Sequence, residues 1–234
     1  MVVVMHASVI DRYAALLLDY CAAVAPGEVV SLNVETPALE LARALVRGTL
    51  ERDAVPRLHL AYPELRQDLV ECAGERYLSS EPELELAEIR RTHAWIRVAA
   101  PANSRALQHA DPGRLGRLET RMRPVQDHRI EHTRWVGTLF PTASGAQDAG
   151  MSLDAYERFV FSAMHLFDDD PAGAWRELAR FQDLLIERLA RADVVRIRGD
   201  GTDLTLRVGG RVWVNSDGGR NMPSGEVFTG PIED

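Results

Sequence analysis

The sequence predicts an α/β protein: a layered α/β/α amino-terminal domain with a mostly parallel sheet, then a short antiparallel β segment. Between residues 28 and 139, short apolar runs typical of strands alternate with stretches of helical periodicity. A tight turn cannot lead to a parallel neighbour, so strands separated by helices pair in parallel through right-handed crossovers. After residue 193, glycine-rich pairs separate shorter strand-like runs, which is typical of antiparallel hairpins.

A helix, a strand and a second helix open the chain. Apolar residues recur at helical spacing over residues 9–24, and Pro26 ends that pattern. Residues 28–34 are typical of a strand. Thr36 is predicted as the N-cap of the next helix, because Pro37 follows it at the first helical position.

The same alternation continues to residue 139. Further strands are predicted over residues 55–61, 94–99 and 133–139, with helical segments between the first two of these strands. Within those segments, Ser80 and Glu83 match the capping box Ser-x-x-Glu. The repetition extends the parallel sheet to four predicted strands.

Two longer helices are predicted over residues 152–166 and 171–191, the second with Asp170 as its N-cap. Short strands joined by Gly-rich turns then follow over residues 194–198, 203–208 and 211–214. We therefore divide the chain into residues 1–192, the α/β amino-terminal domain, and residues 193–234, the beginning of an incomplete second domain. A segment of about forty residues rarely folds alone.

Composition bounds the partners and the compartment. The formal net charge of −8 would repel a polyanion, so we expect no nucleic-acid partner. Cys21 and Cys72 are the only cysteines, too few for a disulfide framework. The apolar start is short, without a basic flank or a membrane-length run. We expect a cytoplasmic protein with no membrane partner.

The most specific motif is the segment Asn-Met-Pro-Ser-Gly-Glu-Val-Phe-Thr-Gly-Pro at residues 221–231. It resembles the signature of the thermophilic aminopeptidase family, the aminopeptidase T or leucyl aminopeptidase-type group of dimetal exopeptidases, in which Asn-x-Pro precedes Glu-Val-Phe-Thr. The resemblance extends upstream through Trp95, Trp135, and Asp170 with Trp175. It covers essentially the whole chain, as an amino-terminal domain plus the start of the catalytic domain.

The resemblance implies that Glu226 is one ligand of a pair of divalent metal ions, zinc, cobalt or magnesium, in the full-length enzyme. Two cations need several carboxylates and imidazoles around them, and one glutamate cannot hold both. The family's other ligands and its catalytic residues lie beyond Asp234. We therefore expect no catalytic residue, no bound metal and no activity in this chain alone. By spacing alone, Glu226 is an ordinary hairpin glutamate.

The resemblance also implies a function for the full-length enzyme, the release of amino-terminal residues such as leucine from short peptides. It further implies a homodimer in which the amino-terminal domain forms one wall of the substrate cavity. An alternative of another class is a non-catalytic dimerisation or binding module that acts through its surfaces. The strand edges after Asp193 favour this alternative, because open edges tend to be covered by another copy or to stay disordered.

Three patterns are weaker. Residues 128–132, His-Arg-Ile-Glu-His, match the inverted zincin motif H-x-x-E-H, but strand-forming residues follow and the helix is expected to end there. We interpret these histidines as solvated or capping. Asp168 to Asp170 are interpreted as a helix start rather than a metal site. A flavodoxin-like nucleotide binder would need an anion site in the loop of residues 100–104.

Overall fold

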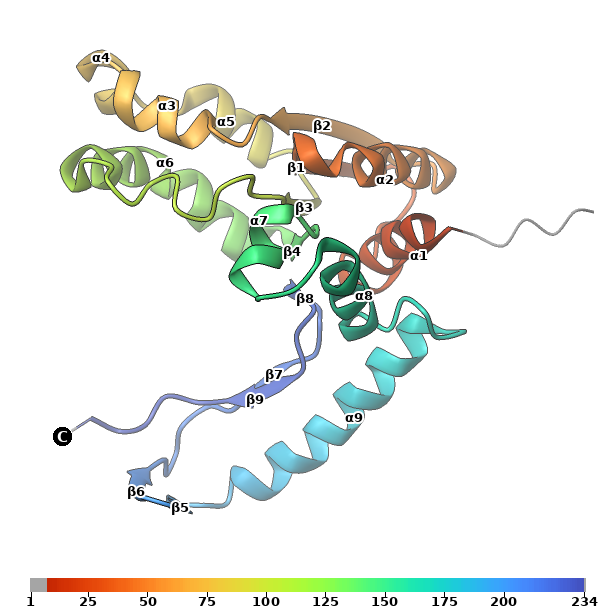
Figure 1. Ribbon diagram of the computed structural model, residues 1–234, viewed down its shortest axis with the longest axis vertical. Helices are drawn as coiled ribbons and strands as arrows, with labels where there is room; N and C mark the ends of the chain where they lie inside the picture. Colours follow the sequence, from red (N-terminus) through yellow and green to blue (C-terminus); the bar gives the residue numbers. More distant parts are fainter. Residues whose placement is uncertain (1–7, 234) are drawn as a thin grey trace, which may run out of the picture.

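Five parallel strands form the central sheet of the computed structural model, which describes residues 8–233 (Figure 1). The strand order is β2 (Val55–Ala61), β1 (Val29–Glu35), β3 (Ala94–Ala99), β4 (Arg134–Leu139) and β8 (Asn221–Met222). Each neighbouring pair is parallel. The α/β class is therefore confirmed, and the four strands predicted before residue 140 lie within one residue of their expected bounds.

One face of this sheet is apolar and forms the main core. Alternate strand residues point to it and are buried: Val30, Leu32, Val34, Ala94, Ile96, Val98 and Val136. They pack against three helices, α1 (Val9–Ala15), α2 (Leu39–Glu51) and α8 (Leu153–Ala163). Burying this face removes most of the strands' apolar surface from water and drives the fold.

The first helix changes its winding before it ends. α1 continues into the π-helical turn η1 (Leu16–Cys21). Together, α1 and η1 cover most of the predicted helix at residues 9–24. The Tyr13 hydroxyl contacts the Thr138 hydroxyl and donates a hydrogen bond to the carbonyl of Leu139 at 2.8 Å. Burial raises the pKa of Tyr13 above its usual range, so this phenol stays neutral and ties the helix to β4.

Thr36 was predicted as the N-cap of the second helix, but it does not hold that position. Glu35 holds the N-cap position before a 3-10 turn, η2 (Thr36–Ala38), which leads into α2. The Glu35 side chain instead accepts a hydrogen bond from the Ala100 amide at 2.7 Å and lies 3.6 Å from the Arg97 guanidinium. A carboxylate at the end of β1 thus bridges to β3, and the tertiary contact decides its role.

The four helices α3 (Leu65–Cys72), α4 (Glu75–Ser79), α5 (Glu83–Ile89) and α6 (Pro112–His132) form a group with a small core of its own, around Val70, Leu78 and Leu118. The predicted capping box is not formed. Pro82 holds the N-cap position of α5, and the Ser80 hydroxyl donates to the carbonyl of Tyr77 at 2.9 Å. The start and length of the long α6 were not predicted; Asp111 caps it by accepting from the Arg114 amide.

The last part of the chain leaves the sheet and returns to it. After α7 (Ala143–Asp148) and α8, the helix α9 (Pro171–Leu189) starts at Asp170, whose carboxylate accepts from the Gly173 amide at 2.8 Å as predicted. The strands β5 (Val194–Gly199) and β6 (Thr202–Arg207) form the predicted antiparallel hairpin. Every helix within residues 8–233 is too short or too polar to cross a lipid bilayer.

The third predicted strand after residue 193 is misplaced. A strand at residues 211–214 was expected to pair with its predecessor through a Gly-Gly turn. Instead β7 (Val214–Ser216) pairs antiparallel with β9 (Glu226–Phe228), and β8 lies between them in sequence but joins the central sheet. A strand from residues 193–234 thus packs on the sheet of residues 1–192, so the two parts are in direct contact.

Candidate functional site

Four polar side chains and one glycine form a row across the sheet on the face opposite the main core. The register pairs Asn33 with His59 on one side and with Arg97 on the other, and then Arg97 with Gly137 and Gly137 with Asn221. We call these five aligned positions, one on each strand, the polar row. A parallel sheet covered on both faces has nearly continuous apolar strands. This face is therefore not packed as a second core.

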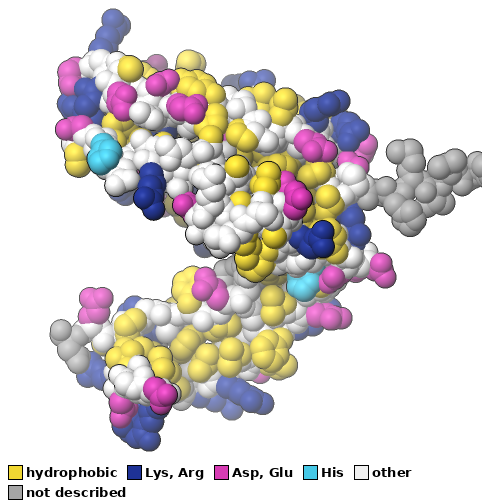
Figure 2. Space-filling view, in the orientation of Figure 1, with side chains coloured by type: hydrophobic (Ala, Val, Ile, Leu, Met, Phe, Trp, Pro, Cys, Tyr) yellow, Lys and Arg dark blue, Asp and Glu magenta, His cyan; other side chains and the backbone are white. Residues whose placement is uncertain are grey.

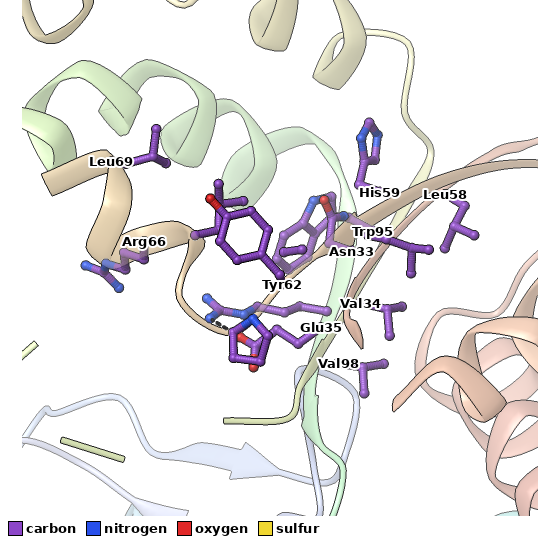
Figure 3. A pocket seen from close by; sticks show the side chains of 15 residues that line it. Asn33, Val34, Glu35, Leu58, His59, Tyr62, Arg66, Leu69, Trp95 and Val98 are labelled. Carbon is purple, nitrogen blue, oxygen red and sulfur yellow. Dashed lines mark ion pairs between the residues drawn. The ribbon is translucent and has the colours of Figure 1, made fainter. Parts of the chain in front are cut away.

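Two connected cavities lie over the polar row. One has a volume of about 690 Å³ and lies at the carboxyl ends of the strands, where the ring of Tyr62 lies near Glu35 and Trp95 (Figure 3). The other, of about 490 Å³, lies between the sheet and the helices α5 and α6. The two share part of their lining: Asn33, His59, Trp95 and Arg97. Together they form a ligand-sized hollow with mixed polar and aromatic walls.

Arg129 of α6 lies over two tryptophans of the sheet. Trp95 and Trp135 are register partners on β3 and β4, and the Arg129 guanidinium lies 4.5 and 4.7 Å from their ring centroids. Burial, with a smaller contribution from the charge of Arg97, lowers the pKa of Arg129 from its ordinary value. The group remains a cation, and part of its hydration has been replaced by aromatic faces.

Glu226 lines a third cavity, of about 720 Å³, on the other side of Trp135. Asn221, Asp217 and Arg220 also line it. The segment that carries these residues is fixed to β4, because the Gly137 amide donates to the Arg220 carbonyl at 2.8 Å. The predicted ligand and the asparagine of its signature are therefore brought to one hollow beside the polar row.

The neighbours of Glu226 do not make up a metal centre by themselves. Across residues 8–233, no three side chains of His, Cys, Asp or Glu come close enough together to hold a metal ion. Asp217 lines the same cavity, but its Oδ1 accepts from the Gly219 amide at 3.0 Å and its carbonyl accepts from the Tyr20 hydroxyl. A two-metal site would need further ligands beside these residues.

The weaker patterns have clear positions. The helix α6 continues through His132, beyond the end expected for it, and the rings of His128 and His132 lie 4.7 Å apart. No third ligand joins them among the described residues. Asp170 caps α9, and the carboxylate of Asp168 lies 2.7 Å from His165. The backbone amide at Ala100 donates to a carboxylate, which disfavours a phosphate in that loop.

Sequence reasoning missed the polar row and Arg129. A signal was present: β1 reads Val-Val-Ser-Leu-Asn-Val-Glu, where polar residues occupy alternate positions in a strand with two parallel neighbours. That alternation indicates one open face. The stacking of Arg129 could not be found in this way, because the sequence did not predict that α6 lies over the tryptophans of the sheet.

A comparison with protein families gives the class of this chain, the metallopeptidases. The chain matches the family described as thermophilic metalloprotease (M29) over residues 6–234. It belongs to this family, and the predicted resemblance is confirmed. Membership in a metalloprotease family implies a divalent metal ion.

The named relatives are aminopeptidases. Aminopeptidase PepS of Streptococcus thermophilus is 27% identical over 95% of this chain and 60% of its own length. Aminopeptidase 2 of Geobacillus stearothermophilus is 26% identical over 96% of this chain and 61% of its own length. The chain thus spans about three-fifths of these relatives.

A solved structure supports the same fold. Wild-type AmpT from Thermus thermophilus superimposes with a TM-score of 0.76 at 22% identity, over 95% of this chain and 61% of AmpT. This likeness confirms the architecture of a mostly parallel sheet with helices and short antiparallel additions.

Proposed function

We propose that this chain is the amino-terminal part of a metal-dependent aminopeptidase that releases residues such as leucine from the amino ends of short peptides. The observation that carries the proposal is the position of Glu226: the signature strand holds it in a cavity that it shares with Asn221 and Trp135. In this proposal Glu226 is one ligand of a pair of divalent ions, zinc, cobalt or magnesium, and no residue of this chain is catalytic. The setting is cytoplasmic, with neither nucleic acid nor membrane as a partner.

Residues 1–192 are proposed as the amino-terminal domain and residues 193–234 as the beginning of the catalytic domain. The position of the cavities supports separate roles for the two domains. The sheet, α5 and α6 line one cavity, while Glu226 on β9 lines a separate cavity that begins at Trp135. The amino-terminal domain would then shape the space for the peptide, and the catalytic domain would carry the metal ions.

We expect the 234-residue chain alone to show no hydrolysis of a leucine anilide, with or without added cobalt or zinc, because one exposed glutamate cannot hold a metal pair. Activity is measured by anilide release, and metal binding by equilibrium dialysis, with Glu226→Gln as the matched variant. Hydrolysis that a chelator abolishes would contradict the incomplete site. If Glu226→Gln then hydrolysed the anilide as fast as the native chain, the ligand role would be wrong too.

An alternative is a dimerisation or binding module without catalysis. Large apolar side chains gather on the lower part of the molecule, over α9 and the strands that follow it (Figure 2). Those exposed there include Phe181, Leu184, Ile197, Leu204 and Val212. A patch of this kind is typical of a surface that binds protein.

The same patch supports a homodimer in either function. We expect light scattering after size exclusion to give twice the chain mass of 26.0 kDa. The double variant Phe181→Ser with Leu184→Ser should shift the protein to monomer, because it removes apolar area from the contact. Arg123→Gln, an exposed change on α6, serves as the control. A native chain that stays monomeric at all concentrations would refute the dimer.

A further inference from the structure

Two guanidinium groups, Arg97 and Arg129, line the cavity between the sheet and α6. Arg97 lies in the polar row, and Arg129 lies over Trp95 in the adjacent row. Burial, and after it the positive charge of Arg97, lowers the pKa of Arg129. An anion between them would relieve this repulsion.

The carboxylates in the same hollow are already paired, and one of them, Glu35, is paired with Arg97 itself. Glu88 lies 2.7 Å from His59, Glu85 lies 3.1 Å from Arg121, and Glu35 accepts from the backbone at Ala100 while it lies 3.6 Å from Arg97. In the described part of the chain, no carboxylate lies within 4.0 Å of Arg129. Arg129 is therefore a half-buried cation in contact with two tryptophan faces, in a cavity large enough for a ligand.

The polar row leads from this pair to the cavity of Glu226. Beyond Arg97 it crosses Gly137, which has no side chain, and it ends at Asn221, whose Oδ1 would lie 3.6 Å from a Cβ at Gly137. The distance from β3 to β8 is two strand spacings, roughly 10 Å. An extended peptide covers that distance with about three residues.

We propose that Arg129, with Arg97, binds the carboxylate at the carboxyl end of a short peptide whose amino end lies in the cavity of Glu226. This inference rests on the proposed function, which it deepens by naming free-acid peptides of about three residues as the preferred substrate class. It also gives the two arginines a role in specificity, because they bind the carboxyl end of the peptide, whereas hydrolysis takes place at the amino end.

The chemistry of the site fits a carboxylate. A guanidinium presents N–H donors in a planar fork that matches a carboxylate in geometry and charge, and such charge-assisted bonds are the strong ones. Trp95 and Trp135 hold the fork of Arg129 by contact with both rings, so it loses little freedom on binding. The same tryptophans offer apolar surface to a peptide side chain.

The test is isothermal titration of the full chain with the tripeptide Leu-Gly-Gly and with its carboxyl-terminal amide, both in EDTA. The free acid should bind at least about tenfold more tightly than the amide, the ratio expected for charge-assisted hydrogen bonds. Arg129→Gln and Arg97→Gln should each reduce this ratio toward one and leave amide binding unchanged. Arg123→Gln, on the same helix but exposed, should keep the native ratio.

Equal binding of acid and amide, or no binding of either, would overturn the proposal. Tighter binding of inorganic phosphate than of the tripeptide would also overturn it, in favour of a phosphate site. If Arg129→Gln fails to fold, the ratio of acid to amide affinity in the native chain and in Arg97→Gln still tests the proposal. The outcome is separate from the proposed function, because a leucine anilide carries no carboxylate and its hydrolysis does not need this site.

Discussion

Trp175→Ala should lower the free energy of unfolding by about 3–5 kcal/mol, the usual cost of removing a large aromatic side chain from a packed core. Trp175 is only 1% exposed, and its indole Nε1 donates to the Met164 carbonyl at 3.2 Å. It also touches the segment that carries the signature, since a Cβ at Gly218 would lie 3.2 Å from its ring. The substitution leaves a cavity and an unpaired carbonyl together.

The measurement is urea unfolding followed by circular dichroism, with Glu187→Ala as the matched control. Glu187 lies on the same helix, but its side chain is exposed, so its removal should change stability by less than about 1 kcal/mol. Similar losses for both variants would mean that Trp175 does not hold α9 to the core.

Gly218→Ala should cost about 2–4 kcal/mol and detach the signature segment from the sheet. The φ of Gly218 is +94°, a conformation that L side chains rarely adopt. An added Cβ would also lie 2.8 Å from Met222 and 3.2 Å from Trp175, both of which are buried. Backbone strain and overpacking therefore act at the same position.

Gly27→Ala separates these two causes. Its φ is +80°, but nothing lies within 4 Å of an added Cβ, so it should cost only the strain, about 1–2 kcal/mol. Stability is measured by chemical unfolding, and detachment of the segment by hydrogen exchange at Gly137, whose amide donates to Arg220. If both alanine variants lost the same stability, the packing against Met222 would not matter.

The local elements show where sequence reasoning works. Strands such as β2 and β3 were predicted at their observed bounds. Each is a short run of strand-forming residues between stretches of helical periodicity. Asp170 before Pro171 gave the start of α9, because a side-chain cap and a proline act within one turn. These signals depend on neighbours in the chain, so they survive without any knowledge of the fold.

Other elements depended on distant contacts. Ser80 and Glu83 match a capping box, yet Pro82 between them holds the cap position. The strand at residues 211–214 was misplaced, because β7 finds its partner in β9 across the intervening β8. The long α6 carries few apolar residues, so its helical period is faint in sequence. In each of these cases tertiary contacts compete with local propensity, and local propensity does not decide the result.

The sequence by itself determined the α/β class, the family, and Glu226 as the residue to examine, because the signature is a local pattern that needs no partner. The polar row, the stacking of Arg129 on Trp95 and Trp135, and the cavity shared by Glu226 and Asn221 were decided by the tertiary structure alone. The physical reason is register: parallel strands far apart in the chain align one residue from each, and no local rule states which residues will be opposite one another.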